Sequence, residues 1–146
     1  MGKLMEDYIF AYELAKRAHS GQVDKAGVDY INHPVAVSDR VYPEKEKTVA
    51  LLHDVVEDTG ITIECLRTLF DDKIANAVEC LTRKSGESYN AYIRRVAQNP
   101  IARHVKIADL SHNMELSRLP VVTEADIKRN EKYRKAMDFL RSADKT

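Results

Sequence analysis

The chain has 146 residues, 44% of them hydrophobic, which is long enough for one domain around a single hydrophobic core. Its 23 Lys and Arg balance 23 Asp and Glu, so there is no basic excess typical of nucleic-acid-binding proteins and no acidic excess typical of disordered tails. No apolar run approaches the ~18 residues of a membrane span, and residues 1–10 lack the apolar core of a signal peptide, so we expect a cytoplasmic protein.

The first half of the chain reads as a series of helices. The first predicted helix has one apolar stripe at helical spacing, formed by Leu4, Tyr8, Ala11, Ala15 and Ala18. It ends at Ser20-Gly21, and a polar loop follows over residues 22–31. Asn32 as N-cap, with Pro34 in the first turn, predicts a second helix to about Tyr42. Pro43-Glu44 then begins a helix that we expect to run to Asp58.

Helical patterns continue to the C-terminus. Further helices are predicted over residues 62–70, 71–83, 88–99, 100–116 and 123–142, separated by a polar loop at 84–88 and by Pro120. Thr123 with Asp126 is expected to cap the last one, whose apolar residues could pack on the core or on a second copy of the chain. Cys65 and Cys80 have no CxxC spacing and are interpreted as unreactive thiols of a reducing compartment. We therefore predict one all-α domain, residues 1–146, of seven or eight helices.

The stretch "LLHDVVEDT", residues 51–59, concentrates four functional groups within six residues of an otherwise apolar run. If the run is one α-helix, His53, Asp54, Glu57 and Asp58 share one face. Such a face can hold a metal ion with two of these groups and transfer protons with the other two. The alternative for Glu57-Asp58 is a solvated helix end, although acidic residues are unfavourable at a helix C-terminus.

A metal site could be completed by residues distant in sequence. The candidate ligands are His33, His53, Asp54 and Asp109. Taken alone, a His before a Pro or a His-Asp pair has an ordinary structural explanation. Asp109, however, lies in an apolar helical pattern, where a carboxylate needs a partner or a metal. Two imidazoles and two carboxylates suit Mn²⁺, Fe²⁺, Zn²⁺ or Mg²⁺, and the lack of a thiolate argues against structural zinc.

Other polar residues near Asp109 are weaker candidates. Asn113 follows Asp109 by four residues, so it shares that helix face and could contact substrate, or it could simply be a surface amide. His112 is a weaker candidate still. His19 and His104 are interpreted as structural or surface histidines.

The segments "AHSGQ", "YINHP", "LLHDVVEDT" and "KIADLSHN" together resemble the HD-domain phosphohydrolase superfamily. More narrowly they are similar to the hydrolase domain of RelA/SpoT-type proteins and to small alarmone hydrolases. The resemblance extends from about His19 to Tyr133. It implies an all-α HD domain, and for a chain of this length a stand-alone hydrolase.

The resemblance also implies a reaction and a set of site residues. The reaction is removal of the 3′-pyrophosphate of guanosine tetra- or pentaphosphate (ppGpp or pppGpp), with one Mn²⁺ held by the four candidate ligands. Glu57 and Asp58 would serve the attacking water. Substrate contacts would come from Lys25, Lys84, Asn113, Arg129 and Tyr133. Zn²⁺, Fe²⁺ or Mg²⁺ could replace Mn²⁺.

Two departures bear on the substrate. Relatives commonly carry a base-stacking Arg at the position of Asp24, and a Pro at that of Asp29. Acidic residues there would repel an anionic substrate at short range. The leading hypothesis is therefore a metal-dependent phosphohydrolase tested first on ppGpp. The alternatives are a nucleotidase or phosphodiesterase acting on another nucleotide, or a non-catalytic domain that binds a nucleotide or metal.

Overall fold

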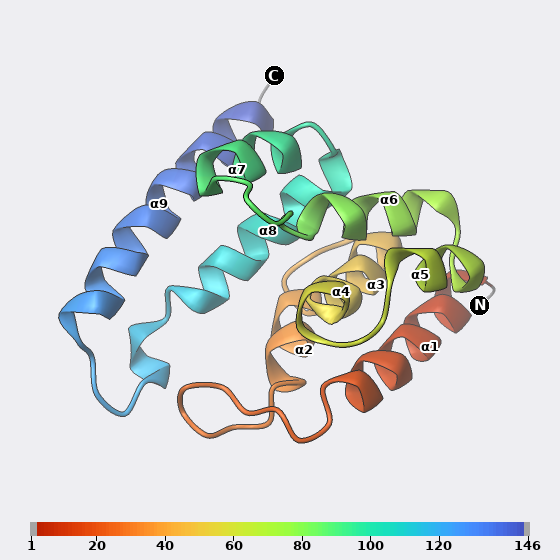
Figure 1. Ribbon diagram of the computed structural model, residues 1–146, viewed down its shortest axis with the longest axis horizontal. Coiled ribbons are helices and arrows are strands. Elements are labelled where there is room, and N and C mark those ends of the chain that lie inside the picture. The colour runs from red at the N-terminus through yellow and green to blue at the C-terminus, as the bar shows by residue number, and fades with distance from the viewer. Residues whose placement is uncertain (1–2, 145–146) are drawn as a thin grey trace.

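The computed structural model describes residues 3–144, which form an all-α fold as predicted (Figure 1). Within this range the chain forms nine α-helices and one 3₁₀ helix, with a single β-bridge between Val23 and Asp29. The elements are α1 (Lys3–Ala18), α2 (Asn32–Ser38), α3 (Glu44–Leu52), α4 (Val55–Asp58), α5 (Ile63–Leu69), α6 (Asp72–Leu81), α7 (Tyr89–Ala97), α8 (Pro100–Asn113), η1 (Leu116–Arg118) and α9 (Glu124–Asp144). None of the helices in this range has the length and apolar character to cross a membrane.

Side-chain caps begin five of these helices. In four, a side-chain oxygen accepts a hydrogen bond from the backbone N–H three residues later, and these caps are Thr62, Asp71, Ser88 and Asn99. At α9, Thr123 and Asp126 cap each other's backbone N–H groups, as predicted. Each such cap contributes ~1 kcal/mol to helix stability.

The second helix differs from its prediction at both ends. The chain enters α2 with Ile31 already in a helical conformation (φ −54°, ψ −27°), and no side chain caps the helix. An N-cap side chain needs an extended backbone, so Asn32, which lies inside the helix, cannot act as one. The helix also ends at Ser38 rather than near Tyr42. Likewise α8 ends at Asn113, and η1 follows where the prediction extended the helix to residue 116.

The predicted single helix from residue 44 to Asp58 is interrupted after Leu52, and α4 begins only at Val55. The backbone N–H of His53 bonds to the carbonyl of Ala50 at 3.4 Å, and the ring Nδ1 of His53 lies 2.6 Å from the same oxygen. A continuous helix would use that carbonyl for the N–H of Asp54. Because the His53 side chain takes it instead, the expectation of one shared helix face is wrong.

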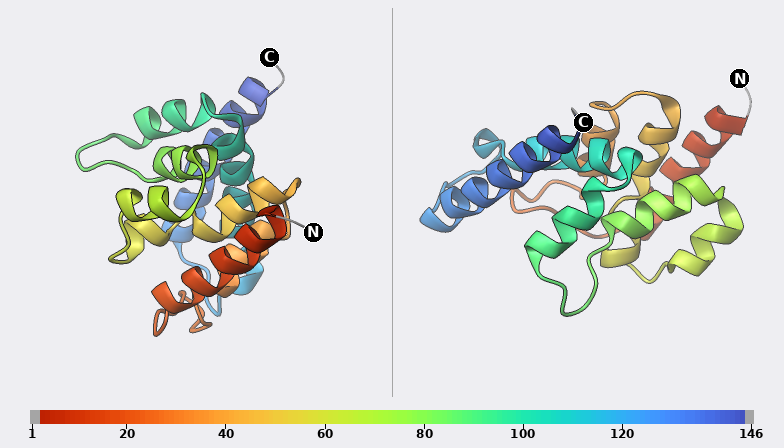
Figure 2. Two further views of the ribbon diagram at one scale, coloured as in Figure 1. Left: turned by 90° about the vertical axis from the view of Figure 1, so that its right-hand side faces the viewer. Right: turned by 90° about the horizontal axis from the view of Figure 1, so that it is seen from above.

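The core lies around α3, which packs against α1, α2, α6 and α8. Its largest fully buried side chains include Leu51, Leu52, Leu66, Ile74 and Leu110. α8 crosses the molecule and α9 returns antiparallel beside it, as the views in Figures 1 and 2 show. In α9, Met137 and Leu140 are buried against the core, whereas Ile127 and Phe139 are exposed. Neither cysteine forms a disulfide.

Candidate metal centre

Two helices and the break between two others bring the four predicted ligands together. His33 comes from α2, His53 and Asp54 from the break between α3 and α4, and Asp109 from α8. One ligand atom each of His33, His53 and Asp109 lie within 4.8 Å of one another, and all three residues are buried. The Oδ2 atom of Asp54 lies 3.0 Å from His53 Nε2 and 3.8 Å from His33 Nε2. A cluster of this size and composition fits a divalent cation.

The orientation of His53 is the most specific feature of the cluster. Its Nδ1 donates to the carbonyl oxygen of Ala50, which directs Nε2 toward the carboxylates of Asp54 and Asp109 at 3.0 and 3.3 Å. Nε2 is buried and makes no hydrogen bond with the residues that the structure describes. Burial would lower the pKa of His53, but the two carboxylates raise it well above its usual value. The site therefore favours a positive charge at Nε2, and a metal ion or a proton can supply it.

His33 is oriented in a similar way by a residue that is not a proposed ligand. Its Nε2 lies 2.8 Å from Asp109 Oδ1, and its Nδ1 lies 2.7 Å from His112 Nδ1. Burial, followed by the guanidinium of Arg118, lowers the pKa of His112 to about 4, so its ring is neutral at pH 7. A neutral His112 can accept the Nδ1 proton of His33, which leaves His33 Nε2 free to bind a metal.

Asp109 and Asp54 are held by further hydrogen bonds. Lys106 Nζ donates to one carboxylate oxygen of Asp109 at 2.9 Å, and Asn113 Nδ2 donates to the other at 3.0 Å. Burial would raise the pKa of Asp109, but Lys106 and the nearby histidines keep it well below its usual value. The Tyr30 hydroxyl donates to Asp54 Oδ2 at 2.5 Å. Burial would raise the pKa of Asp54 as well, yet His53 lowers it to about 2, so both aspartates are ionised.

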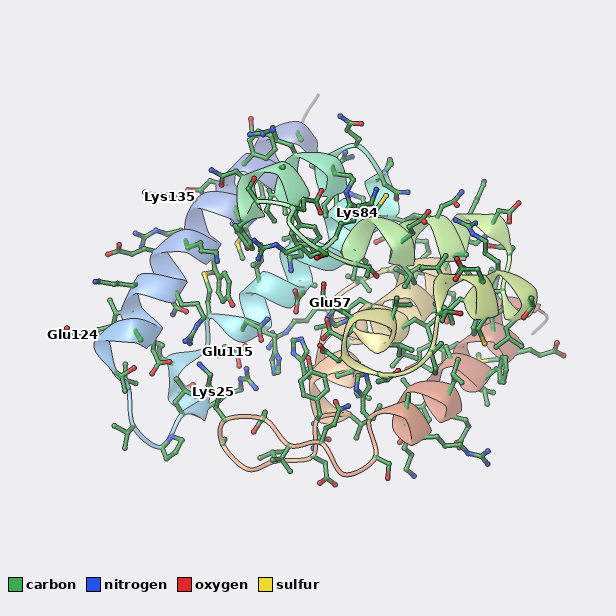
Figure 3. All side chains as sticks on the ribbon, viewed as in Figure 1. Lys25, Glu57, Lys84, Glu115, Glu124 and Lys135 are labelled. Atoms are coloured by element: carbon green, nitrogen blue, oxygen red, sulfur yellow. The ribbon has the colours of Figure 1, made fainter. Side chains whose placement is uncertain are left out.

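The predicted acidic pair follows the metal cluster directly. Glu57 and Asp58 lie in the only turn of α4, so the expected conflict with the dipole of a long helix is small. Glu57 Oε1 accepts the backbone N–H of Arg83 at 2.7 Å, which ties α4 to the loop before α7. Figure 3 shows Glu57 near the centre of the molecule, with Lys84 of that loop above it. Burial, then Asp54 and Glu57, raises the pKa of Asp58.

A pocket of about 360 Å³ adjoins the cluster. Tyr30 and Asn113, which contact the two aspartates of the cluster, form part of its wall. Four of the five predicted substrate-binding residues line it, namely Lys25, Asn113, Arg129 and Tyr133. Lys84 is exposed and does not line it. The pocket is thus the natural place for a substrate whose reacting group reaches the metal cluster.

Acidic and basic groups are paired around this pocket. Asp24 Oδ1 accepts the backbone N–H groups of Ala26 and Val28, and its Oδ2 lies 3.7 Å from the guanidinium of Arg118. Figure 3 shows Lys25 just below Glu115 in this part of the molecule. Asp24 therefore shapes its own loop, and Arg118 partly neutralises the charge that the sequence places at the pocket.

Three residues of the site carried no role in the sequence analysis. They are Tyr30, Lys106 and Arg118. Tyr30 belongs to the "YINHP" segment, and Lys106 precedes Asp109 by three residues, a spacing at which helical side chains meet. That spacing could have identified Lys106 as a partner for a buried carboxylate. By contrast, His19 contacts Gln22 Oε1 and the Tyr30 ring, as a structural histidine would.

Comparison with known proteins agrees with this geometry. A family model described as "HD domain" matches residues 11–110, a range that includes the four candidate ligands. A GTP pyrophosphokinase from Streptomyces coelicolor is 35% identical over 144 residues, which cover 89% of this chain and 16% of that protein. The bifunctional (p)ppGpp synthase/hydrolase SpoT from Escherichia coli is 33% identical over 119 residues, or 71% of this chain and 17% of SpoT. The chain spans only about one sixth of the curated relatives it matches.

A solved structure is similar over nearly the whole chain. It is described as a metazoan ortholog of SpoT that hydrolyzes ppGpp and plays a role in starvation responses. The TM-score is 0.77, with 25% sequence identity, and the match covers 94% of this chain and 86% of that one.

Proposed function

Because this chain belongs to the HD domain family, we propose that it is a metal-dependent phosphohydrolase that removes the 3′-pyrophosphate of ppGpp and pppGpp. The products would be pyrophosphate and GDP or GTP. The observation that carries the proposal is the buried cluster of His33, His53 and Asp109, in which His53 Nε2 faces two carboxylates. The ppGpp-related names of its relatives and of its structural neighbour support the choice of substrate. In keeping with its two free cysteines, we place the enzyme in the cytoplasm.

His33, His53, Asp54 and Asp109 are the residues that would hold the ion, and Mn²⁺ is the first ion to test, ahead of Zn²⁺, Fe²⁺ and Mg²⁺. A divalent ion at this position supplies a Lewis acid that polarises a phosphoryl oxygen and makes water more acidic. The chain's own contribution is orientation. Ala50 and His112 fix the two imidazole rings, while Tyr30 and Asn113 fix the two carboxylates. Fixed ligands of this kind keep the site in a reactive geometry.

The acidic pair is assigned to proton transfer. In the reaction, water adds to the phosphorus next to the ribose 3′ oxygen, the bond from that phosphorus to the 3′ oxygen breaks, and the 3′ oxygen takes up a proton. Glu57 would orient the water and accept its proton. Asp58, whose pKa is raised by burial and by neighbouring carboxylates, would assist by returning a proton. Glu57 Oε1 accepts a hydrogen bond from the backbone N–H of Arg83, so the other oxygen of Glu57 is the one that would face the water.

The pocket beside the cluster is assigned to the nucleotide. Lys25 and Arg129, both of which contact Asp126, would offset negative charge on the phosphates. Lys84 would also offset phosphate charge, from the loop whose Arg83 N–H donates to Glu57. Asn113 and Tyr133 would contact the ribose or a phosphate from the pocket wall.

One observation favours a second candidate substrate. Asp24 stands where relatives commonly carry a base-stacking Arg, and it is fixed by three contacts in its own loop and with Arg118. A different nucleotide base would then be preferred, and the enzyme would be a nucleotidase or phosphodiesterase with the same metal chemistry.

The test is an activity assay with purified protein, Mn²⁺ and ppGpp, with products separated by anion-exchange chromatography. We expect GDP and pyrophosphate in equal amounts. A parallel panel of nucleoside monophosphates and cyclic nucleotides tests the alternative. If the protein cleaves a nucleotide of this panel but not ppGpp, the alarmone is excluded as its substrate, and the assignment as a hydrolase stands.

A further inference from the structure

A second concave surface lies between α7 and α9, away from the pocket at the metal cluster. Its volume is about 480 Å³, within the range of small-molecule sites. The groove is lined by Tyr89, Asn90, Ile93, Arg94, Lys128, Glu131, Lys132, Lys135, Ala136 and Phe139. None of these residues has a role in the proposed hydrolysis.

The groove and the substrate pocket are lined by different faces of α9. Arg129 and Tyr133, four residues apart, line the pocket. Lys128, Lys132 and Lys135 follow a separate helical stripe and line the groove. Figure 3 shows Lys135 on the upper part of α9, distant from Lys25 and Glu115 at the pocket. The helix therefore separates two distinct sites.

Positive charge is concentrated in this groove. Four cations line it, against one carboxylate, Glu131. Over residues 3–144, no ion pair involves any of these five charged groups. Some basic residues outside the groove do form ion pairs, such as Arg95 with Glu87 and Arg103 with Asp144. The groove is thus locally positive, although the whole chain has zero net charge.

Lys132 lies over an aromatic ring that also contacts a second cation. Its Nζ is 4.0 Å from the centroid of the Tyr89 ring, and the guanidinium of Arg83 lies 5.7 Å from the same centroid. Burial lowers the pKa of Lys132, and the nearby charges of Arg83 and Arg129 lower it further. An anion bound here would relieve this repulsion.

We propose that the groove between α7 and α9 is a second anion site that binds a phosphate chain, either free or attached to a nucleoside. Lys128, Lys132 and Lys135 extend over ~10 Å along the helix, enough to follow two or three linked phosphates. Lysine ammonium groups bind phosphate as point charges without needing one fixed geometry. The exposed ring of Phe139 provides an aromatic face on which a nucleobase could stack.

The experiment measures binding of inorganic tripolyphosphate to the whole chain by calorimetry and by amide NMR shifts. We expect shifts in α7 and on the groove face of α9. The double variant Lys132→Gln/Lys135→Gln should weaken binding at the groove about tenfold or more. The matched control Lys73→Gln, an exposed lysine of α6, should leave it unchanged. Arg129→Gln, at the substrate pocket, reports any binding of tripolyphosphate there.

Unchanged affinity in the double variant, or loss of affinity only in Arg129→Gln, would overturn the proposal. ATP as a second ligand distinguishes the two sources of the phosphate chain. If ATP binds more tightly than tripolyphosphate and Phe139→Ala removes the difference, the natural ligand is a nucleotide. If ATP and tripolyphosphate bind equally, the ligand is a free phosphate chain. Either result supports the site, and neither depends on whether the chain hydrolyses ppGpp.

Discussion

The Nδ1 atoms of His33 and His112 lie 2.7 Å apart, so a ring that is not a proposed ligand determines which nitrogen of a ligand faces the metal cluster. Replacing His112 with Leu removes this partner and leaves the orientation of His33 unrestrained. Loss of such an outer contact typically lowers metal affinity ~10–100-fold. We expect a loss in this range for Mn²⁺, measured by calorimetry.

His112→Asn is the matched control for this prediction. The Asn side-chain oxygen can accept the His33 Nδ1 proton in the place of the imidazole nitrogen. It should therefore retain most of the affinity. Equal affinities in the Leu variant and in the unmodified protein would show that His112 does not orient His33.

Glu57→Gln separates catalysis from structure. The Gln oxygen can still accept the backbone N–H of Arg83, so the link between α4 and the loop before α7 is kept. The basic carboxylate is lost, and kcat should fall ~10²–10⁴-fold with the metal content unchanged. Steady-state kinetics on ppGpp, together with elemental analysis, measures both. If the variant keeps the full kcat, Glu57 does not act as the base in this reaction.

Metal binding should stabilise the fold, because its ligands come from α2, α8 and the break after α3. At an ion concentration of 100 times Kd, the gain in unfolding free energy is about 2.7 kcal/mol. For a chain of this size that raises Tm by roughly 5–10 °C. Thermal melts with Mn²⁺ and with EDTA provide the measurement. His53→Ala should abolish the difference, while His104→Gln, a histidine away from the cluster, should retain it; an equal shift in His53→Ala would contradict the site.

The candidate ligands were predictable because the residue types themselves limit the chemistry. His33, His53 and Asp109 suggest a metal site wherever they meet, and the structure places them within 4.8 Å. Their supporting contacts were harder to anticipate. The hydrogen bond from Tyr30 to Asp54 joins residues 24 positions apart, with α2 and α3 between them. Nothing in local periodicity reports such a contact.

The break in the predicted helix shows a second limit. Val49, Leu52 and Val56 keep helical spacing on both sides of His53, so the pattern predicts one helix to Asp58. The break depends on the His53 ring bonding the carbonyl of Ala50, which is a choice of side-chain conformation. In this conformation His53 Nε2 lies 3.3 Å from Asp109 of α8, a tertiary contact that local periodicity does not report.

His104 predicts a pH dependence that is separate from the metal cluster. Its Nδ1 lies 2.9 Å from Glu46 of α3, and its Nε2 lies 2.6 Å from Asp144 at the end of α9. Burial would lower the pKa of His104, but these two carboxylates raise it above its usual value of 6.5. The stabilisation is therefore complete below pH 6.5 and is lost as the pH rises through the higher pKa of the folded state.

Because His104 is about one third exposed, the effect should be modest, about 0.2–1 kcal/mol. Urea unfolding at several pH values from 6 upward should show the unmodified protein losing this much stability relative to His104→Gln, which cannot titrate. The loss should disappear in 1 M salt, since exposed ion pairs are screened. A constant difference between the two proteins across that range would mean that folding does not change the pKa of His104, and that its two ion pairs do not stabilise the fold.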